Sequence, residues 1–347
     1  MTVTDLVDKL TLERDLDDGG LESILNCNEP EELEHLYSSA RDVSIRHHGN
    51  TVHLRALVEW SNVCRNDCLY CGIRCGNASL SRYTLSTDEI LDACSRAYAL
   101  GLRTFVLQGG ENPAAAEILA PTVSLIKSFW SDAAVTLSLG ELPFETYELL
   151  RNAGADRYLL RHETADKAHY AMLHPEGMAL ENRMDCLRSL KTLGYQVGTG
   201  MMVGSPFQST RNLVADLRFI QELRPEMVGI GPFIPHKDTP LGTYPKGSAE
   251  LTLKLYSIVR LMLPDANIPS TTALSVIEPE GRIKGILAGA NVIMPNFSPL
   301  PHRADYAIYE GKASLSLEAE ENQKQIEKEL HNHGYLVGKD RGDYQEN

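Results

Sequence analysis

Short apolar runs and longer amphipathic segments alternate along the chain after Gly49. Each run has the length of a β-strand, and the segments between the runs have the apolar spacing of helices that bury one face. The runs lie at 54–61, 103–109, 134–140, 156–163, 196–204, 227–233, 267–274 and 290–296. Strands that alternate with helices pair in parallel through right-handed crossovers, and eight such strands close a barrel. The pattern predicts an α/β fold, a (β/α)8 TIM-type barrel, with an open doubly wound sheet as the alternative.

Helix signals between the first two predicted strands support this pattern. Ser86 can cap a helix that starts at residue 87, and Glu89 three residues later can complete a capping box. Gly101 follows the last apolar turn, where a glycine commonly ends a helix.

The two ends of the chain lie outside the repeating pattern. Residues 1–50 have helical apolar spacing, with acidic residues near the predicted helix starts. From about Ser314 the chain reads as a charged helix, and it ends in the polar stretch KDRGDYQEN. We therefore expect an N-terminal helical extension at 1–50, the barrel at 51–312, and a solvated C-terminal helix with a loose tail at 313–347.

Polar side chains gather at the late ends of the predicted strands. They are Gln108, Glu111, Ser138, Glu141, Arg161, Glu163, Thr271, Thr272 and Asn296. In (β/α)8 enzymes the active site lies at the carboxyl ends of the strands. This distribution favours a barrel enzyme over a barrel without catalysis.

The overall charge limits the partners that the surface can attract. The formal net charge is −14 and the sequence pI is about 5.3. Nucleic acids and anionic membranes attract clustered Lys and Arg, so neither is an expected partner. No basic region followed by an apolar core opens the chain, and no run reaches the roughly 18 apolar residues of a membrane span. We expect a cytoplasmic protein.

Four of the seven cysteines lie in one short stretch, SNVCRNDCLYCGIRC at 61–75. Because disulfides are rare in a reducing compartment, four cysteines this close together indicate metal ligands or redox groups. Cys64, Cys68 and Cys71 are spaced C-x3-C-x2-C directly after the first predicted strand. Three thiolates on one loop can hold three irons of a [4Fe–4S] cluster and leave the fourth iron open.

Other roles for the thiols remain as alternatives. A structural zinc site needs four ligands, usually in two pairs, and no second pair follows downstream. Cys75 can complete a four-cysteine ferredoxin-like set, although its spacing matches neither common ferredoxin run. A thioredoxin-type C-x-x-C motif leaves Cys64 unexplained. An iron–sulfur carrier without catalysis is the alternative from a different functional class. The scattered Cys27, Cys94 and Cys186 are expected to be small buried side chains on helices.

The cysteine spacing, with Tyr70 before the last cysteine and a barrel strand before the loop, resembles the radical S-adenosylmethionine (SAM) superfamily. The resemblance implies that Cys64, Cys68 and Cys71 are the catalytic cluster ligands, and that the open iron binds the amino and carboxylate groups of SAM. An electron from the cluster then cleaves SAM to a 5′-deoxyadenosyl radical. A low-potential electron donor such as ferredoxin or flavodoxin is implied as a partner.

Further segments resemble the SAM-binding positions of this superfamily. They are VLQGGENP at 106–113, GADRYLLRHETA at 154–165 and ENR at 181–183. Glu111 would accept from the methionine ammonium, Glu163 from the ribose hydroxyls, and Arg183 would pair with the SAM carboxylate. The cofactor-binding residues implied by the resemblance are Tyr70, Gln108, Gly110, Glu111, Ser138, Glu163 and Arg183.

From about residue 50 to about 312, the chain resembles the HydE family of [FeFe]-hydrogenase maturases. The matching segments include VTLSLGELP at 135–143, MVGIGPFIPHKDTPL at 227–241, IPSTTAL at 268–274 and ANVIMPNFSP at 290–299. This branch also holds biotin synthase and methylornithine synthase. The resemblance implies a cysteine-ligated iron carbonyl cyanide species as the substrate, with other hydrogenase maturases as partners. An enzyme of the same branch that acts on another small sulfur or amino-acid substrate is the alternative.

The substrate-binding residues that we expect are Thr136, Arg157, Arg161, Met227, Thr271, Thr272 and Tyr306. Arg157 and Arg161 lie an even number of residues apart on one strand and would share a face of it, where they could line a small anion-binding pocket. Their alternative role is to pair with barrel carboxylates such as Glu163 or Asp156. No cysteine follows Cys186, so a single cluster is expected.

Overall fold

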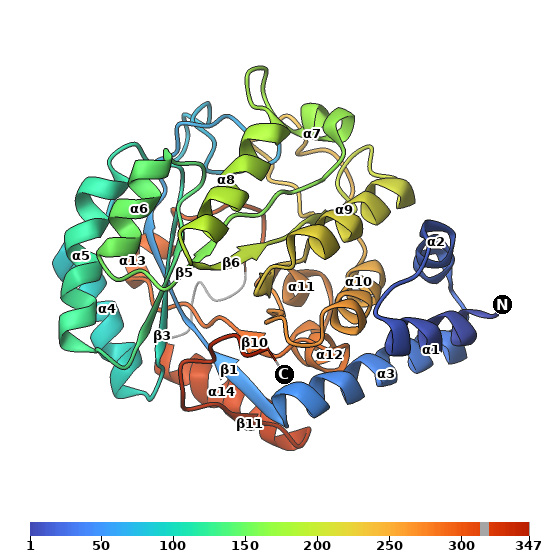
Figure 1. Cartoon of the computed structure of the whole chain (residues 1–347). Coiled ribbons are helices and arrows are strands. Elements are labelled where there is room, and N and C mark those ends of the chain that lie inside the picture. The colour runs from blue at the N-terminus through green and yellow to red at the C-terminus, as the bar shows by residue number, and fades with distance from the viewer. Residues whose placement is uncertain (313–318, 347) are drawn as a thin grey trace.

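The computed structural model describes residues 1–312 and 319–346 as an almost wholly parallel barrel wrapped in helices (Figure 1). The strands are β1 (Thr51–Leu54), β2 (Ala56–Ser61), β3 (Thr104–Gly109), β4 (Ala134–Ser138), β5 (Arg157–Leu159), β6 (Gln196–Thr199), β7 (Met202–Val203), β8 (Met227–Val228), β9 (Gly231–Pro232), β10 (Val292–Ile293) and β11 (Leu336–Val337). The helices are α1 (Val3–Glu13), α2 (Asp18–Asn26), α3 (Pro30–His48), α4 (Thr87–Ala99), α5 (Ala115–Phe129), α6 (Phe144–Asn152), α7 (Lys167–Leu173), α8 (Leu180–Thr192), α9 (Thr210–Leu223), α10 (Ala249–Met262), α11 (Thr272–Ile277), α12 (Gly281–Leu287), α13 (Leu300–Arg303) and α14 (Ala319–Asn332).

The sheet closes on itself. Strands β2, β3, β4, β5, β6 and β8 are neighbours in that order, and every pair is parallel. Parallel bridges continue the ring from Met227 to Asn267, from Pro269 to Val292, and from Asn296 back to Leu57. The predicted (β/α)8 barrel is therefore confirmed, and the open doubly wound sheet is wrong.

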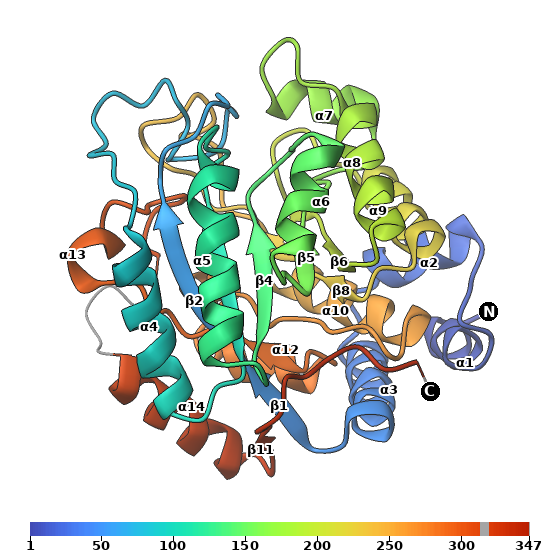
Figure 2. The ribbon, with the colours of Figure 1, turned by 60° about the vertical axis from the view of Figure 1, so that its left-hand side comes forward.

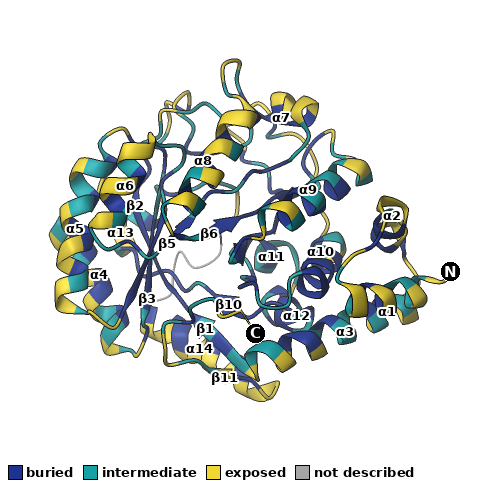
Figure 3. Cartoon of the chain, in the orientation of Figure 1, coloured by how far each residue is buried: buried dark blue, intermediate teal, exposed yellow. Residues whose placement is uncertain are grey.

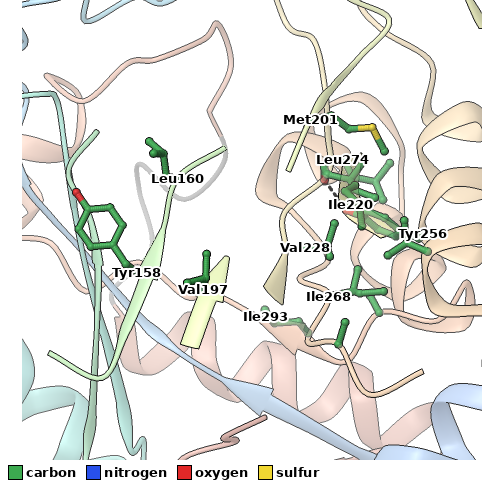
Figure 4. Close-up of a cluster of buried hydrophobic side chains, with 14 of the residues drawn as sticks. Tyr158, Leu160, Val197, Met201, Ile220, Val228, Tyr256, Ile268, Leu274 and Ile293 are labelled. Carbon is green, nitrogen blue, oxygen red and sulfur yellow. Dashed lines mark hydrogen bonds between the residues drawn. The ribbon is translucent and has the colours of Figure 1, made fainter. Parts of the chain in front are cut away.

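Apolar side chains on the outer faces of the strands pack against the surrounding helices. Tyr158 of β5 meets Tyr147 of α6 edge to face at 5.0 Å between ring centroids. Figure 3 shows that buried residues concentrate on the strands and on the inward faces of the helices. Figure 4 shows Tyr158, Val197 and Val228 from successive strands as part of this core. Along β5, the alternate residue Arg157 therefore points into the barrel.

Several predicted strands are shorter than their apolar runs. The runs at 196–204 and 227–233 each divide into two short strands. Between these strands the two backbones approach closely, since a Cβ at Gly200 would lie 1.9 Å from the Gly229 carbonyl oxygen. A glycine within a strand often marks such an approach. The run at 267–274 is not a strand. It makes only isolated bridges at Asn267 and Pro269, and α11 begins at Thr272. Proline cannot donate to a ladder, which limits pairing there.

The predicted helix between β2 and β3 is confirmed in detail. The Ser86 hydroxyl accepts from the Glu89 amide, and the Glu89 carboxylate accepts from the Ser86 amide. Gly101 adopts a φ of 91° just beyond the end of α4. The residues before the barrel form α1, α2 and α3, which lie beside α9, α10 and α12 (Figure 1). His47 of α3 contacts Asp265 at 2.7 Å, and Arg218 of α9 contacts Asp15 and Asp18 at 2.8 Å.

The prediction of a loose polar tail is wrong. Strand β11 pairs in parallel with β1, and the residues after it cross the amino ends of the barrel strands (Figure 2). There Arg341 O accepts from Thr104 and Arg157, and Gly342 O accepts from Arg55 and Asn267. Backbone carbonyls of the tail thus satisfy buried donors at this end. The predicted helix start near 314 falls within 313–318, outside the described residues.

Candidate active site at the carboxyl ends of the strands

The loop that follows β2 carries the three predicted cluster ligands to the end of the barrel opposite the tail (Figure 2). Turns within the loop gather them: the Cys71 amide donates to Cys68 O at 3.3 Å, and the Cys75 amide donates to Asn66 O at 2.9 Å. Cys64, Cys68 and Cys71 are half-buried, whereas Cys75 is exposed.

Arg82 fixes the shape of this loop. Its guanidinium donates to Asn62 O at 2.7 Å, to Ile73 O at 2.8 Å and to Arg74 O at 2.6 Å. Arg74 in turn pairs with Asp67 at 2.5 Å. A single cation that satisfies several carbonyl groups holds a loop without regular secondary structure in one conformation.

Gly110 lets the end of β3 approach the cysteine loop. A Cβ at this position would lie 2.4 Å from Val63 O and 2.8 Å from Cys64 Cβ. The next amide, of Glu111, lies 3.4 Å from Cys64 Sγ, and the Arg65 amide donates to Glu111 O at 3.0 Å. The backbone of the predicted Gly-Gly-Glu segment therefore lies directly beside a predicted cluster ligand.

The three thiols share one electrostatic environment. Burial, followed by the neighbouring Cys64 thiolate, raises the pKa of Cys71 to about 12, and burial followed by Cys71 raises the pKa of Cys68. Burial also raises the pKa of Cys64. Buried neighbouring thiolates need positive charge to form, and bound iron would supply it.

Within 1–312 and 319–346, no group of three or more His, Cys, Asp or Glu side chains could hold a single metal ion. A cubane differs from such a site because each thiolate binds its own iron. Three half-buried thiols on one loop supply the donor set that such a cluster takes.

Glu163 lies beyond the end of β5 in a left-handed backbone conformation, with a φ of 67°. Its amide donates to Gly200 O, its carbonyl accepts from the Met202 amide, and its side chain is 2.8 Å from Arg161 Nη2. Burial is the main cause that raises the pKa of Tyr70, and the Glu163 carboxylate is the second. The same carboxylate also raises the pKa of Cys68. The predicted ribose-binding carboxylate thus faces the cysteine loop.

Arg183 reaches the same region from α8. Its Nε donates to Arg161 O at 2.9 Å, and its Nη1 pairs with Glu141 at 2.7 Å. The guanidinium, only 8% exposed, lowers the pKa of Cys68, although burial dominates and the net shift of that pKa is upward. Arg183, Glu163 and the cysteine loop therefore lie together at this end of the barrel.

Tyr70 joins the cysteine loop to α7. Its hydroxyl lies 3.3 Å from His174 Nε2, the two rings meet edge to face at 5.5 Å, and the Leu69 amide donates to Leu173 O at 3.0 Å. At the ends of β3 and β4, Gln108 is the register partner of Ser138, so both point to the same face of the sheet.

Tyr306, predicted for the substrate, contacts a residue predicted for the cofactor. Gln108 Nε2 donates to the Tyr306 hydroxyl at 3.3 Å, and the tyrosine is 2% exposed. The Glu111 carboxylate, by contrast, is occupied by protein groups. It pairs with Arg65 at 2.6 Å and accepts from the Glu141 amide at 2.8 Å, so its predicted contact with SAM stays a prediction.

The structure does not bring Arg157 into one pocket with Arg161. The Arg157 guanidinium is fully buried and points to the amino end of the barrel, where it binds Thr104, Gln196 and Asp343 of the tail. All three guanidinium nitrogens of Arg157 have protein partners, so the prediction that Arg157 and Arg161 line one anion pocket is wrong. Arg157 does form an ion pair, as the alternative suggested, but with Asp343 of the tail and not with a barrel carboxylate.

Other predicted substrate residues also separate. Met227 contacts Arg55 Nη1 through its sulfur at 3.0 Å, near the tail. Thr271 lies beside the Tyr256 hydroxyl at 3.2 Å, whereas Thr272 lines a separate cavity of about 170 Å³ with residues of α12, β10 and α14.

Thr136 Oγ1, Arg161 Nε and Arg55 Nε are among the buried side-chain atoms that lack hydrogen-bond partners in the residues that the structure describes. Sequence reasoning found the first two residues and missed Arg55. It also missed Glu59, which is fully buried, accepts from Asn296 at 2.9 Å and pairs with Lys312. The available signal was a charged residue in the middle of an apolar strand, which is rare without a partner.

Comparisons with known proteins place this geometry in a family. The model described as the radical SAM superfamily matches residues 58–220. The [FeFe] hydrogenase maturase subunit HydE of Thermotoga maritima is 46% identical over 313 residues, which cover 90% of this chain and 89% of the relative. The 3-methylornithine synthase of Methanosarcina acetivorans is 32% identical over 298 residues, 84% of this chain and 83% of the relative.

Solved structures agree. The crystal structure of methylornithine synthase (PylB) matches with a TM-score of 0.85 and 27% identity, over 96% of this chain and 97% of that one. The maturase HydG matches with a TM-score of 0.82 at 19% identity, over 97% of this chain and 76% of that one, which supports the fold. This chain therefore belongs to the radical SAM superfamily and, within it, to the HydE family, whose members are enzymes that use a [4Fe–4S] cluster and SAM.

Proposed function

We propose that this chain is an [FeFe]-hydrogenase maturase that cleaves SAM reductively and acts on a cysteine-ligated iron carbonyl cyanide precursor of the hydrogenase H-cluster. The observation that carries the proposal is the convergence of three half-buried thiols with Glu163 and Arg183 at the carboxyl ends of the strands. The 46% identity with a HydE subunit over nine-tenths of the chain supports the choice within the superfamily.

In this proposal Cys64, Cys68 and Cys71 would hold the [4Fe–4S] cluster. When bound, the cluster would supply the electron that cleaves SAM to methionine and a 5′-deoxyadenosyl radical. The contribution of the chain is to keep the loop rigid through Arg82 and to bring the Gly110 and Glu111 backbone against Cys64.

The SAM molecule would lie between the cysteine loop and the ends of β3, β4 and β5. Glu163 would accept from the ribose hydroxyls, and Arg183 would pair with the carboxylate. The residues that would complete the SAM site are Tyr70, Gln108, Gly110, Glu111 and Ser138. Because Arg183 already touches Glu141, its charge would be shared between Glu141 and the SAM carboxylate.

The substrate would lie in the barrel beneath SAM. The unpaired Thr136 Oγ1 and Arg161 Nε favour a small ligand with hydrogen-bond acceptors, because buried polar atoms without partners are costly. Tyr306, which contacts Gln108, would form part of the wall of the substrate site. Thr271 stays a candidate for contact with the substrate, whereas Met227 and Thr272 would contribute through packing.

The proposal includes a low-potential electron donor such as ferredoxin or flavodoxin, and other hydrogenase maturases as partners. We also propose a cytoplasmic location. In the described parts of the chain, no helix is long and apolar enough to span a membrane. In this proposal residues 51–312 form the catalytic barrel, and residues 1–50 and 313–347 are its N-terminal and C-terminal extensions.

Anaerobic reconstitution with iron and sulfide, followed by SAM and dithionite, tests the core of the proposal. We expect 5′-deoxyadenosine well above the level of a Cys68→Ala variant, and equal amounts from both would refute SAM cleavage. A matched control is Cys94→Ala, because Cys94 is fully buried on α4 and has no predicted role in the cluster.

A second experiment tests the substrate. A synthetic cysteine–iron carbonyl cyanide complex should increase 5′-deoxyadenosine formation and be consumed in proportion. Indifference to that complex would favour the alternative, an enzyme of the same branch with another amino-acid or sulfur substrate. The similarity to 3-methylornithine synthase makes amino acids the first such substrates to try.

A further inference from the structure

A buried His–Asp pair lies directly behind the Glu163 turn. His162 and Asp216 are both fully buried, and His162 Nε2 lies 3.2 Å from Asp216 Oδ1. Asp216 comes from α9, whereas His162 is the neighbour of Glu163 along the chain. Neither side chain has the exposure needed to touch SAM, so the proposed function gives them no part in the chemistry.

The pair fixes the turn at two points. His162 Nδ1 lies 2.9 Å from Thr199 Oγ1 on β6, and the Ala165 amide donates to Asp216 Oδ1 at 2.5 Å. The backbone from 162 to 165 is therefore held between β6 on one side and α9 on the other. A carboxylate that accepts from a backbone amide makes a charge-assisted bond, which is the stronger kind.

Hydrogen bonds at both ring nitrogens fix the orientation of the imidazole. His162 Nδ1 lies 2.9 Å from Thr199 Oγ1, and His162 Nε2 lies 3.2 Å from Asp216 Oδ1. A carboxylate accepts a hydrogen bond from an imidazole N–H, whereas the amide of asparagine presents both a donor and an acceptor. Asp216 therefore holds the imidazole in one orientation.

The turn needs such support. Glu163 has a φ of 67°, a conformation that side chains other than glycine rarely adopt and that persists only when the surroundings impose it. The conformation turns the carboxylate toward Arg161 and the cysteine loop. A relaxed backbone at Glu163 would move the carboxylate away from the place where SAM is proposed to bind.

The same turn also supports the other side of the site. Thr164, the next residue, is fully buried, and its hydroxyl lies 3.0 Å from His169 Nδ1. His169 belongs to α7, the helix whose end accepts from Leu69 beside Tyr70. Displacement of the 162–165 turn would thus reach both Glu163 and the cysteine loop.

We propose, building on the SAM site of the proposed function, that Asp216 and His162 are positioning residues for SAM. The pair holds the Glu163 turn in the backbone conformation that directs the Glu163 carboxylate to the cofactor. The feature that carries this inference is the buried hydrogen-bonded chain from Thr199 through His162 to Asp216 and the Ala165 amide.

The test uses the full-length, reconstituted holoenzyme and the variants Asp216→Asn, His162→Leu and His162→Gln. The readouts are KM for SAM and kcat for 5′-deoxyadenosine formation, together with the EPR spectrum of the reduced cluster with and without SAM. Asp156→Asn is the matched control, because Asp156 also accepts from a backbone amide, that of Val135 at 2.8 Å, but lies at the amino end of β5.

We expect Asp216→Asn and His162→Leu to raise KM for SAM about tenfold or more, through loss of a charge-assisted bond. Iron content and the EPR spectrum without SAM should stay as in the wild type, while the spectral change on SAM addition should weaken. His162→Gln keeps a donor toward Asp216 and should stay within about threefold of the wild type. If Asp216→Asn does not fold, the two His162 variants decide.

A KM for SAM within twofold of the Asp156→Asn value in both Asp216→Asn and His162→Leu would overturn the inference, even if both variants were less stable. Glu163→Gln separates this failure from that of the proposed function. If Glu163→Gln raises KM while the Asp216 and His162 variants do not, the SAM site stands and the positioning role falls. If Glu163→Gln has no effect, both fall.

Discussion

Asp343 Oδ1 lies 2.6 Å from Arg157 Nη2, so the C-terminal tail neutralises a fully buried guanidinium at the amino end of the barrel. Gln196 donates to the same carboxylate at 3.1 Å, and Arg341 pairs with both Asp343 and Asp156. The tail therefore closes the end of the barrel that lies opposite the cysteine loop.

Asp343→Asn should destabilise the fold by about 2 kcal/mol, because it leaves the buried Arg157 charge without its carboxylate. The value lies below the range for fully buried pairs, since Asp343 keeps about a third of its side chain exposed. Chemical unfolding of the two proteins measures the difference. Asp185→Asn, at the exposed Arg188 pair, should cost less than about 0.5 kcal/mol, and equal effects of the two variants would contradict the expectation.

This ion pair also shows what could not be predicted. Asp343 and Arg157 are 186 residues apart, and no local periodicity in a polar nonapeptide indicates its binding surface. The barrel, in contrast, follows from local signals that repeat, namely apolar runs, caps and glycines at turns. The three cysteines of the proposed cluster site could be singled out because their spacing lies within one loop.

The interior of the barrel was predictable only in part. Even spacing correctly indicated that Arg157 faces inward, but it did not show that the guanidinium bends toward the tail. Asp216 gave no signal in the sequence, because it is one acidic residue of an amphipathic helix and its partner lies 54 positions away. Contacts between distant segments depend on the packed fold.

Cys75→Ala should leave both iron binding and SAM cleavage intact, whereas Cys71→Ala should abolish them. Cys75 is exposed, and its amide, which donates to Asn66 O, survives the substitution. Iron analysis after reconstitution should give about four irons per chain for Cys75→Ala. Loss of the cluster in Cys75→Ala would restore the four-cysteine alternative.

The stability of the holoenzyme should fall as the pH drops below about 6.5, in part because of His174. Burial, at 3% exposure, lowers the pKa of His174 to about 3, so the folded protein keeps the imidazole neutral. The unfolded chain takes up this proton near its ordinary pKa, about 6.5. Protons bound only by the unfolded state favour unfolding, so the contribution of His174 is complete above that pKa and is lost toward pH 3.

Urea unfolding at pH 7.5 and pH 5.5 measures this effect, which can reach about 1.4 kcal/mol per pH unit for one group. His174→Gln should lower stability at both pH values, because it removes the ring that stacks on Tyr170 at 3.8 Å. It should also make the loss between the two pH values smaller. An unchanged pH dependence in His174→Gln would show that other groups carry it.

Thr136→Val should separate stability from substrate binding. The Thr136 hydroxyl is buried without a partner among the described residues, so a methyl group of the same size should leave stability unchanged or raise it by about 1 kcal/mol. Thr122→Val is the control, because that buried hydroxyl donates to Ile118 O at 2.7 Å and its loss should cost about 1 kcal/mol. If Thr136 contacts the substrate, Thr136→Val should raise KM for the iron complex about tenfold while KM for SAM stays unchanged. A variant with a normal KM for the complex would place the substrate elsewhere in the barrel, and one with a raised KM for SAM would move Thr136 into the cofactor site.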